Sequence, residues 1–179
     1  NYEIEPGATG GFHRGLELNG VNGDVEVFNT LITDMNNTGI FIDGGAPNLA
    51  YQGTVTNNSA TGGPPLIDIQ NTTGGTISIA AGSTPGSYPA GDPHCLVATT
   101  VQNSLSDTGA GGIVVDKSVS NITMDNLTIT NSVNAAISVT DSSGKIDIGL
   151  GGPATITQIP GTLLSPSAAG LLIDGGAPT

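Results

Sequence analysis

The sequence lacks several features on which common folds and activities depend. It has no Trp and only three Tyr and three Phe, so aliphatic side chains must fill the core and few rings are present for stacking on sugars. Cys95 is the single cysteine, which excludes an internal disulfide and a cysteine-based zinc site. Three Lys and Arg stand against fifteen Asp and Glu, and this acidity disfavours nucleic acid or anionic membrane as a partner.

The sequence is rich in residues that form turns and short strands. It holds 28 Gly and 11 Pro, and its polar residues are dominated by Asn, Thr and Ser, which disfavour helix interiors. No apolar run approaches the roughly 20 residues that a membrane-spanning helix needs. The 179 residues suffice for one domain, so we expect a single β-domain over 1–179, a segment of a longer repetitive chain.

A nine-residue segment occurs twice, with two aliphatic or aromatic differences. Gly39–Pro47 is GIFIDGGAP and Gly170–Pro178, 131 positions later, is GLLIDGGAP. The same five-residue pattern, with aliphatic residues at its second and fourth positions, occurs six times, as GLELN, GIFID, LIDIQ, GIVVD, AISVT and GLLID. Side chains two apart in a strand share a face. We therefore predict twelve inward residues: Leu16, Leu18, Ile40, Ile42, Ile67, Ile69, Ile113, Val115, Ile137, Val139, Leu171 and Ile173.

The spacing of these segments predicts a parallel β-helix of about six rungs. The intervals are 24, 27, 46, 24 and 34 residues, which gives rungs of roughly 24 residues with insertions at about 80–98 and 149–160. Further alternating strands are expected in each rung, at DVEVF, GTISI, NITM and KIDI. Stacked rungs bury an apolar face that one rung cannot bury alone. A β-sandwich would also have many short strands, but it would not require the same aliphatic pattern at a constant interval.

The rung pattern over residues 14–176 resembles right-handed parallel β-helix repeat proteins, the pectin-lyase-like superfamily in the broad sense. It is most similar to the acidic, Asn-, Thr- and Gly-rich repeats of bacterial surface and secreted proteins. The resemblance implies an all-β right-handed solenoid and an extracellular or cell-surface location. It lies in the periodicity, and the paired "DD", "GHG" and "RIK" signatures of the polysaccharide-cleaving members are absent.

The last position of each strand forms the candidate binding row. This outward row could line a groove for sugar or for Ca²⁺, which prefers carboxylate and carbonyl oxygens. Alternatively, each side chain bonds to the turn that follows its strand. Its acids alternate with Asn, Gln and Thr, which argues against a continuous calcium array, so we expect no cofactor and leave calcium open. The row is Asn19, Asp43, Gln70, Asp116, Thr140 and Asp174.

The sequence contains two other groups of polar residues that could have a catalytic, metal-binding or structural role. Asp92, His94 and Cys95 form a cluster in the Pro- and Gly-rich insertion, but no second His or orienting pair accompanies them, so we expect no catalytic residues. The Asn residues that precede the next rung by a constant offset are expected to stack as an amide array: Asn29, Asn103 and Asn126.

The composition and the repeat favour a structural function. We expect a non-enzymatic module of an extracellular or cell-surface protein, such as a rod segment of a fibre, adhesin or surface layer. Its partners would be like chains or adjacent repeats stacked end to end, because GLLIDGGAPT carries no polar cap. The alternative is a carbohydrate-binding or carbohydrate-cleaving β-helix domain of the secreted hydrolase, lyase or phage tailspike type.

Overall fold

A computed structural model describes residues 2–4, 14–35, 37–57, 64–80, 103–106, 112–125, 127–130, 135–149, 155–157 and 170–178. All regular structure in these ranges is β-strand, arranged in two sheets in which every pairing is parallel. The described residues include no helix long and apolar enough to span a membrane. Short strands are what the many Gly, Asn, Ser and Thr residues allow, since these residues end strands in turns.

The six-stranded sheet consists of the six predicted repeat strands. Neighbours along the sequence are neighbours in the sheet, and each strand pairs position by position with the next, so that Ile40 lies opposite Ile67. All six strands are four residues long. In sheet order they are β2 (Leu16–Asn19), β4 (Ile40–Asp43), β6 (Ile67–Gln70), β9 (Ile113–Asp116), β12 (Ile137–Thr140) and β15 (Leu171–Asp174).

The nine-stranded sheet divides along the long strand β5 (Ala46–Asn57). One side of β5 pairs with β3 (Asn22–Met35), which in turn pairs with β1 (Tyr2–Ile4). The other side carries two separate stacks. The first half of β5 pairs with the stack β7 (Thr76–Ala80), β10 (Asn121–Asp125) and β13 (Ile146–Ile148). The second half pairs with the stack β8 (Asn103–Ser106), β11 (Leu127–Thr130) and β14 (Thr155–Thr157).

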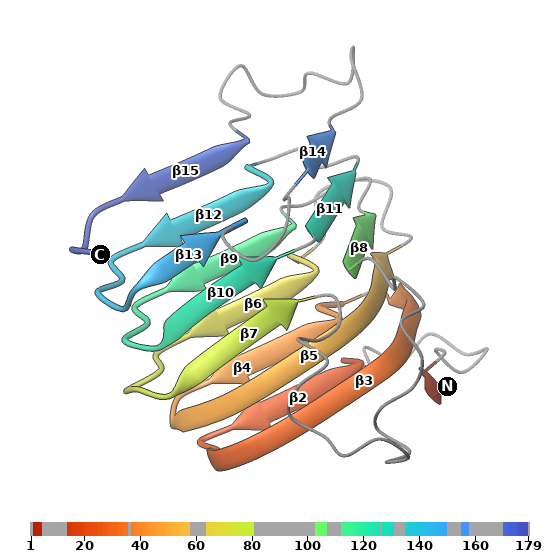
Figure 1. The fold of residues 1–179 in the computed structure, drawn as a ribbon, viewed down its shortest axis with the longest axis horizontal. Helices are drawn as coiled ribbons and strands as arrows, with labels where there is room; N and C mark the ends of the chain where they lie inside the picture. The colour runs from red at the N-terminus through yellow and green to blue at the C-terminus, as the bar shows by residue number, and fades with distance from the viewer. Residues whose placement is uncertain are drawn as a thin grey trace.

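The chain passes alternately between the two sheets, which enclose one core (Figure 1). Nine of the twelve predicted inward residues are buried, with Ile40, Ile42 and Ile67 fully inaccessible. They pack against the inward residues of the nine-stranded sheet: Leu49, Ile77, Ile79, Ile122 and Met124. The exceptions are Leu16, which is partly buried, and Leu171 and Ile173, which are exposed on the last strand.

A repeated turn joins the six-stranded sheet to the other sheet. The residue after each strand has a positive φ, between 47° and 70°, at Gly20, Gly44, Asn71, Lys117, Asp141 and Gly175. Its N–H donates to a carbonyl of the next repeat, as from Gly44 to Gln70 at 3.0 Å. The next position holds Gly, Ser or Thr in five of the six turns and Val21 in the first. The buried hydroxyls of Thr72 and Ser118 lie 2.6 Å apart there.

Two sequence-based expectations about strands need correction. The predicted insertion at 149–160 contains β14, which pairs with β11 as a regular part of the sheet, so this segment is part of the repeat rather than wholly an insertion. The insertion at 80–98 lies almost wholly outside the described residues. The structure pairs Asn103 with Leu127, whereas the sequence predicted that Asn103 aligns with Asn126. Asn126 itself lies outside the described residues.

Phe41 occupies an outward position of β4, yet its side chain is buried. It is 7% exposed, because the guanidinium of Arg14 lies over its ring, 3.6 Å from the centroid. A cation over an aromatic face is attracted by the ring quadrupole. Replacing Phe41 should therefore cost more than replacing the partly exposed Val114 on the same face.

We predict a large loss of stability from replacing one of two adjacent valines of β9 and a small loss from replacing the other. Val115 is fully buried, so Val115→Asp should lower the free energy of unfolding by about 3 kcal/mol or more, through an unpaired buried charge. Val114→Ser, on the outward face, should cost less than about 1 kcal/mol. Thermal or urea unfolding measures both. A larger loss for Val114→Ser would show that the register is wrong by one residue.

The repeated turn predicts unequal costs for two glycine substitutions. Gly20 has φ +62° with open space around it, so Gly20→Ala should cost only the left-handed conformation, about 1 kcal/mol. Gly45 has φ +71°, and a Cβ there would overlap the backbone of Val21. Gly45→Ala should therefore cost about 3 kcal/mol or more. Equal losses in urea unfolding would contradict the close packing of successive turns.

Candidate functional site

The structure brings the whole candidate row together on the outer face of the six-stranded sheet. Its members lie opposite one another in adjacent strands, in the order Asn19, Asp43, Gln70, Asp116, Thr140 and Asp174. Parallel strands are about 4.8 Å apart, so the row is a continuous line of polar side chains. Periodicity alone was sufficient to find it, because the row requires only that all strands share one register.

Two hydrogen bonds of the row come from the turns that follow the strands. Asp43 Oδ1 accepts from Asn71 Nδ2 at 2.9 Å, and Asp116 Oδ2 accepts from Lys117 Nζ at 3.0 Å. Asn71 and Lys117 are positive-φ turn residues. These bonds favour the structural interpretation of the row at these two positions. Within the described ranges no group of three or more His, Cys, Asp and Glu could hold a metal ion, and calcium binding stays a prediction.

A second outward row lies two positions earlier in each strand and includes Glu17 and Phe41. These two residues form a cluster with Arg14 that the sequence did not reveal. Arg14 precedes β2, covers the ring of Phe41, and its Nη1 lies 2.7 Å from Glu17 Oε1. Glu17 also accepts from Asn19 Nδ2 at 2.7 Å. The only signal in the sequence was a lone arginine next to a repeat strand. Its partner Phe41 follows 27 residues later and meets it only through strand pairing.

The carboxyl of Asp68, on this face, has a raised pKa. It lies opposite Phe41 on one side and Val114 on the other. Burial raises the pKa of the Asp68 carboxyl above its ordinary value of 3.8, and the charges of Asp116 and Asp43 raise it further, while Arg14 lowers it. Partial burial beside apolar neighbours disfavours the ionised carboxylate. This shift could not be predicted from the sequence, because its cause is the packing of three strands.

The aromatic rings that the structure describes with their side chains do not form an open platform. Phe41 lies under Arg14, and Tyr51 of β5 is 1% exposed within the core. Burial raises the pKa of the Tyr51 hydroxyl. Sugar-binding sites place exposed rings along a groove, so these two positions do not favour the carbohydrate alternative. Asp92, His94 and Cys95 lie outside the described residues.

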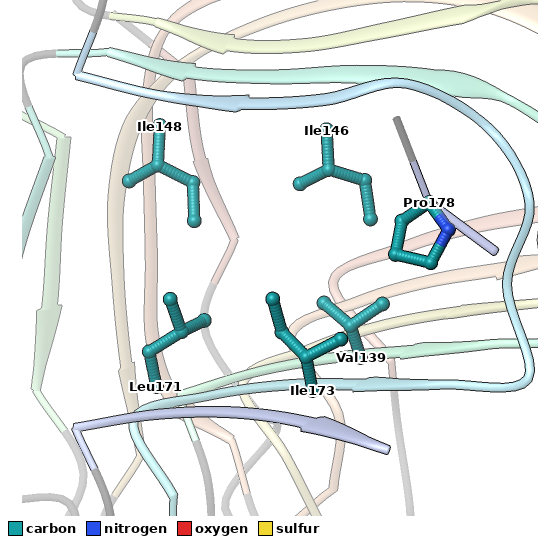
Figure 2. Close-up of a pocket in the computed structure, with 6 residues that line it drawn as sticks. All are labelled: Val139, Ile146, Ile148, Leu171, Ile173 and Pro178. Atoms are coloured by element: carbon teal, nitrogen blue, oxygen red, sulfur yellow. The ribbon is translucent and has the colours of Figure 1, made fainter. Parts of the chain in front are cut away.

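The core is open at the end formed by β15. An apolar cavity of about 270 Å³ lies between β13 and β15. Figure 2 shows its six lining residues, all of which are apolar: Val139, Ile146, Ile148, Leu171, Ile173 and Pro178. Leu171 and Ile173, both inward by position, are 46% and 55% exposed. β15 is the last strand of its sheet, and β13 is the last strand of its stack. This end therefore presents inward side chains and strand edges without a further layer among the described residues.

Comparison of the chain with protein-family models, with curated proteins and with solved structures gives no match. The interpretation of this end and of the outer rows therefore depends on their own geometry.

The raised pKa of Asp68 predicts a stabilising substitution that depends on pH. An acid whose folded-state pKa is raised destabilises the fold where it is ionised, so the penalty is present at pH 7 and disappears below about pH 3, where both states are protonated. Asp68→Asn should raise the melting temperature at pH 7 and leave it unchanged at about pH 3. Asp43→Asn is the control and should give no gain, because Asp43 accepts a hydrogen bond from Asn71. A gain for Asp68→Asn that persists at the lower pH would refute this account.

Proposed function

We propose that the two sheets are walls of a right-handed parallel β-helix, in which each circuit of the chain adds one strand to each wall. Support comes from the alternation of the chain between the sheets and from the single core that both sheets enclose. The stack β8, β11 and β14 would form a third wall, continuing from the second half of β5. Crossovers between parallel strands are right-handed in nearly all proteins, which favours this hand.

We further propose a non-enzymatic structural function: the chain is a rod segment of a fibre, adhesin or surface layer that stacks end to end on like repeats. The observation that carries this proposal is the open apolar end at β15, where Leu171, Leu172 and Ile173 are each about half exposed. An exposed strand edge pairs readily with a further strand, and solenoids without caps extend in this way. Stacking would bury Leu171 and Ile173, which line the cavity, and would pair the edge of β15.

The extracellular or cell-surface location is proposed from the resemblance of the repeats to bacterial surface proteins. The chemistry of the chain is compatible with it. The net charge of −12 opposes side-by-side association through mutual repulsion, whereas the apolar end favours association along the axis. A rod of this kind depends on stacking for its rigidity, since the single cysteine provides no internal crosslink.

Self-association of the purified chain tests the structural function. We expect light scattering to grow with concentration, electron microscopy to show linear assemblies, and diffraction along their axis to show a repeat near 4.8 Å. Leu171→Asp should prevent assembly by placing a charge at the apolar end. Val119→Asp is the control, since Val119 is 50% exposed but lies in a turn away from that end, and it should assemble normally.

A stable monomer at high concentration would contradict the proposal if amide hydrogen exchange also showed that β2 and β15 are both protected. In that case the ends would be covered by the chain itself, and a self-contained domain would replace the rod.

A further inference from the structure

The two copies of the nine-residue segment adopt the same backbone conformation. Gly44 and Gly45 have φ of 70° and 71°, and Gly175 and Gly176 have 70° and 65°. Both copies dock on the preceding repeat in the same way: Ala46 N–H donates to Val21 O at 3.0 Å, and Ala177 N–H donates to Ser142 O at 2.9 Å. One copy is therefore a structural template for the other.

In the first copy, the side that faces the following repeat is occupied. Ile40 N–H donates to Leu66 O and Gly44 N–H to Gln70 O, both at 3.0 Å. Asp43 Oδ1 accepts from Asn71 Nδ2 at 2.9 Å, and Gly45 O accepts from Thr73 N–H at 2.7 Å. Thr73 Oγ1 donates to the same carbonyl at 3.0 Å.

The fit of the segment Leu66–Ile79 against the first copy also depends on a glycine. Gly75 has φ +84°, and a Cβ there would overlap the carbonyl oxygen of Pro47. The segment Leu66–Ile79 therefore combines aliphatic residues that enter the core, an Asn and a Thr that bond to the turn, and a Gly that allows close approach to the proline.

In the second copy, the equivalent side is open among the described residues. β15 ends the order of its sheet, and the residues from Leu171 to Ala177 are all exposed. By equivalence, Leu171 N–H and Gly175 N–H are the donors, and Asp174 Oδ1 and Gly176 O are the acceptors. The cavity lined by Leu171 and Ile173 would receive the aliphatic side chains of an incoming strand (Figure 2).

We propose that the edge Leu171–Pro178 is a binding site for an extended peptide strand with the pattern of Leu66–Ile79, which pairs in parallel with β15. Main-chain hydrogen bonds at a sheet edge give affinity, and pockets for alternate side chains give specificity. This inference rests on the proposed stacking function and specifies the pattern of the adjacent repeat that would stack most tightly on this end. Among the described residues, β2 is the other end strand of its sheet. It is followed by Gly20 and Val21, so its turn lacks the Asn and Thr that bond to the first copy, and a like chain would stack through β2 more weakly than such a repeat.

Binding of a labelled synthetic peptide to the complete chain tests the proposal. The labelled peptide is LIDIQNTTGGTISI, residues 66–79. Its fluorescence anisotropy should rise as the protein is added. Within this peptide Ile69→Asp should weaken binding at least about tenfold, because Ile69 enters the core, whereas Asp68→Asn should bind equally or more tightly. The peptide GLELNGVNGDVEV, residues 15–27, should bind at least about tenfold more weakly than residues 66–79.

Two protein variants on the same strand locate the site. Ile173→Asp should weaken peptide binding at least about tenfold, because Ile173 lines the cavity. Leu172→Asp is the matched control: Leu172 is 44% exposed but lies outside the cavity lining, so binding should change by less than about threefold. Thermal melts that match the parent chain establish that both variants fold.

Three results would overturn the proposal: no binding at about 1 mM peptide, equal binding by the Ile173→Asp variant, or tighter binding of residues 15–27. Failure of this inference is separable from failure of the rod. Assembly of the chain without peptide binding would retain the rod and reject this edge specificity. Peptide binding by a chain that stays monomeric would retain the site and reject the rod.

Discussion

In-register parallel pairing between successive repeats is the interaction on which the remaining structure depends. Because side chains in a strand alternate with a period of two, a slip by one residue would turn Ile40 and Ile42 to the outer face and turn Phe41 and Asp43 toward the core. The observed register instead aligns aliphatic residues in every strand of the six-stranded sheet. A single core then runs through all repeats, and the polar row and the covered Phe41 both follow from this alignment.

The turn after each strand maintains that register. Each of the six repeats has a positive-φ residue directly after its strand. The N–H groups of five of these residues donate to a carbonyl of the next repeat along the chain. The next position is Gly, Ser or Thr in five of the six turns, and the hydroxyls of Thr72 and Ser118 satisfy each other there. The recurrence of Asp-Gly-Gly-Ala-Pro has the same cause. The two positions that differ are an inward Ile or Leu, where either fits, and an outward Phe or Leu, where only the Phe lies under Arg14.

Repetition also gives the molecule its unequal ends. A regular repeat satisfies its strand edges through its neighbours, and among the described residues β15 has a neighbour on one side only, beside an apolar cavity. The polar outer rows are bonded internally at Asp43, Asp116 and Glu17. Within the part of the chain that the structure describes, the edge of β15 therefore offers backbone and aliphatic chemistry to a partner. This distribution is why assembly, rather than catalysis, is the function proposed for the chain.

The sequence by itself determined the six repeat strands, their inward residues and the candidate row, because each depends on a short-range alternation that repeats along the chain. Tertiary structure alone decided how β5 divides its sheet, why Phe41 is buried, why Lys117 has a positive φ and why the pKa of Asp68 is raised. Each of these depends on neighbours from another repeat, 24 or more residues away, as in the pairing of Glu17 with Phe41. Periodicity predicts that such neighbours exist, but only the packed strands fix which side chains meet and how much water remains between them.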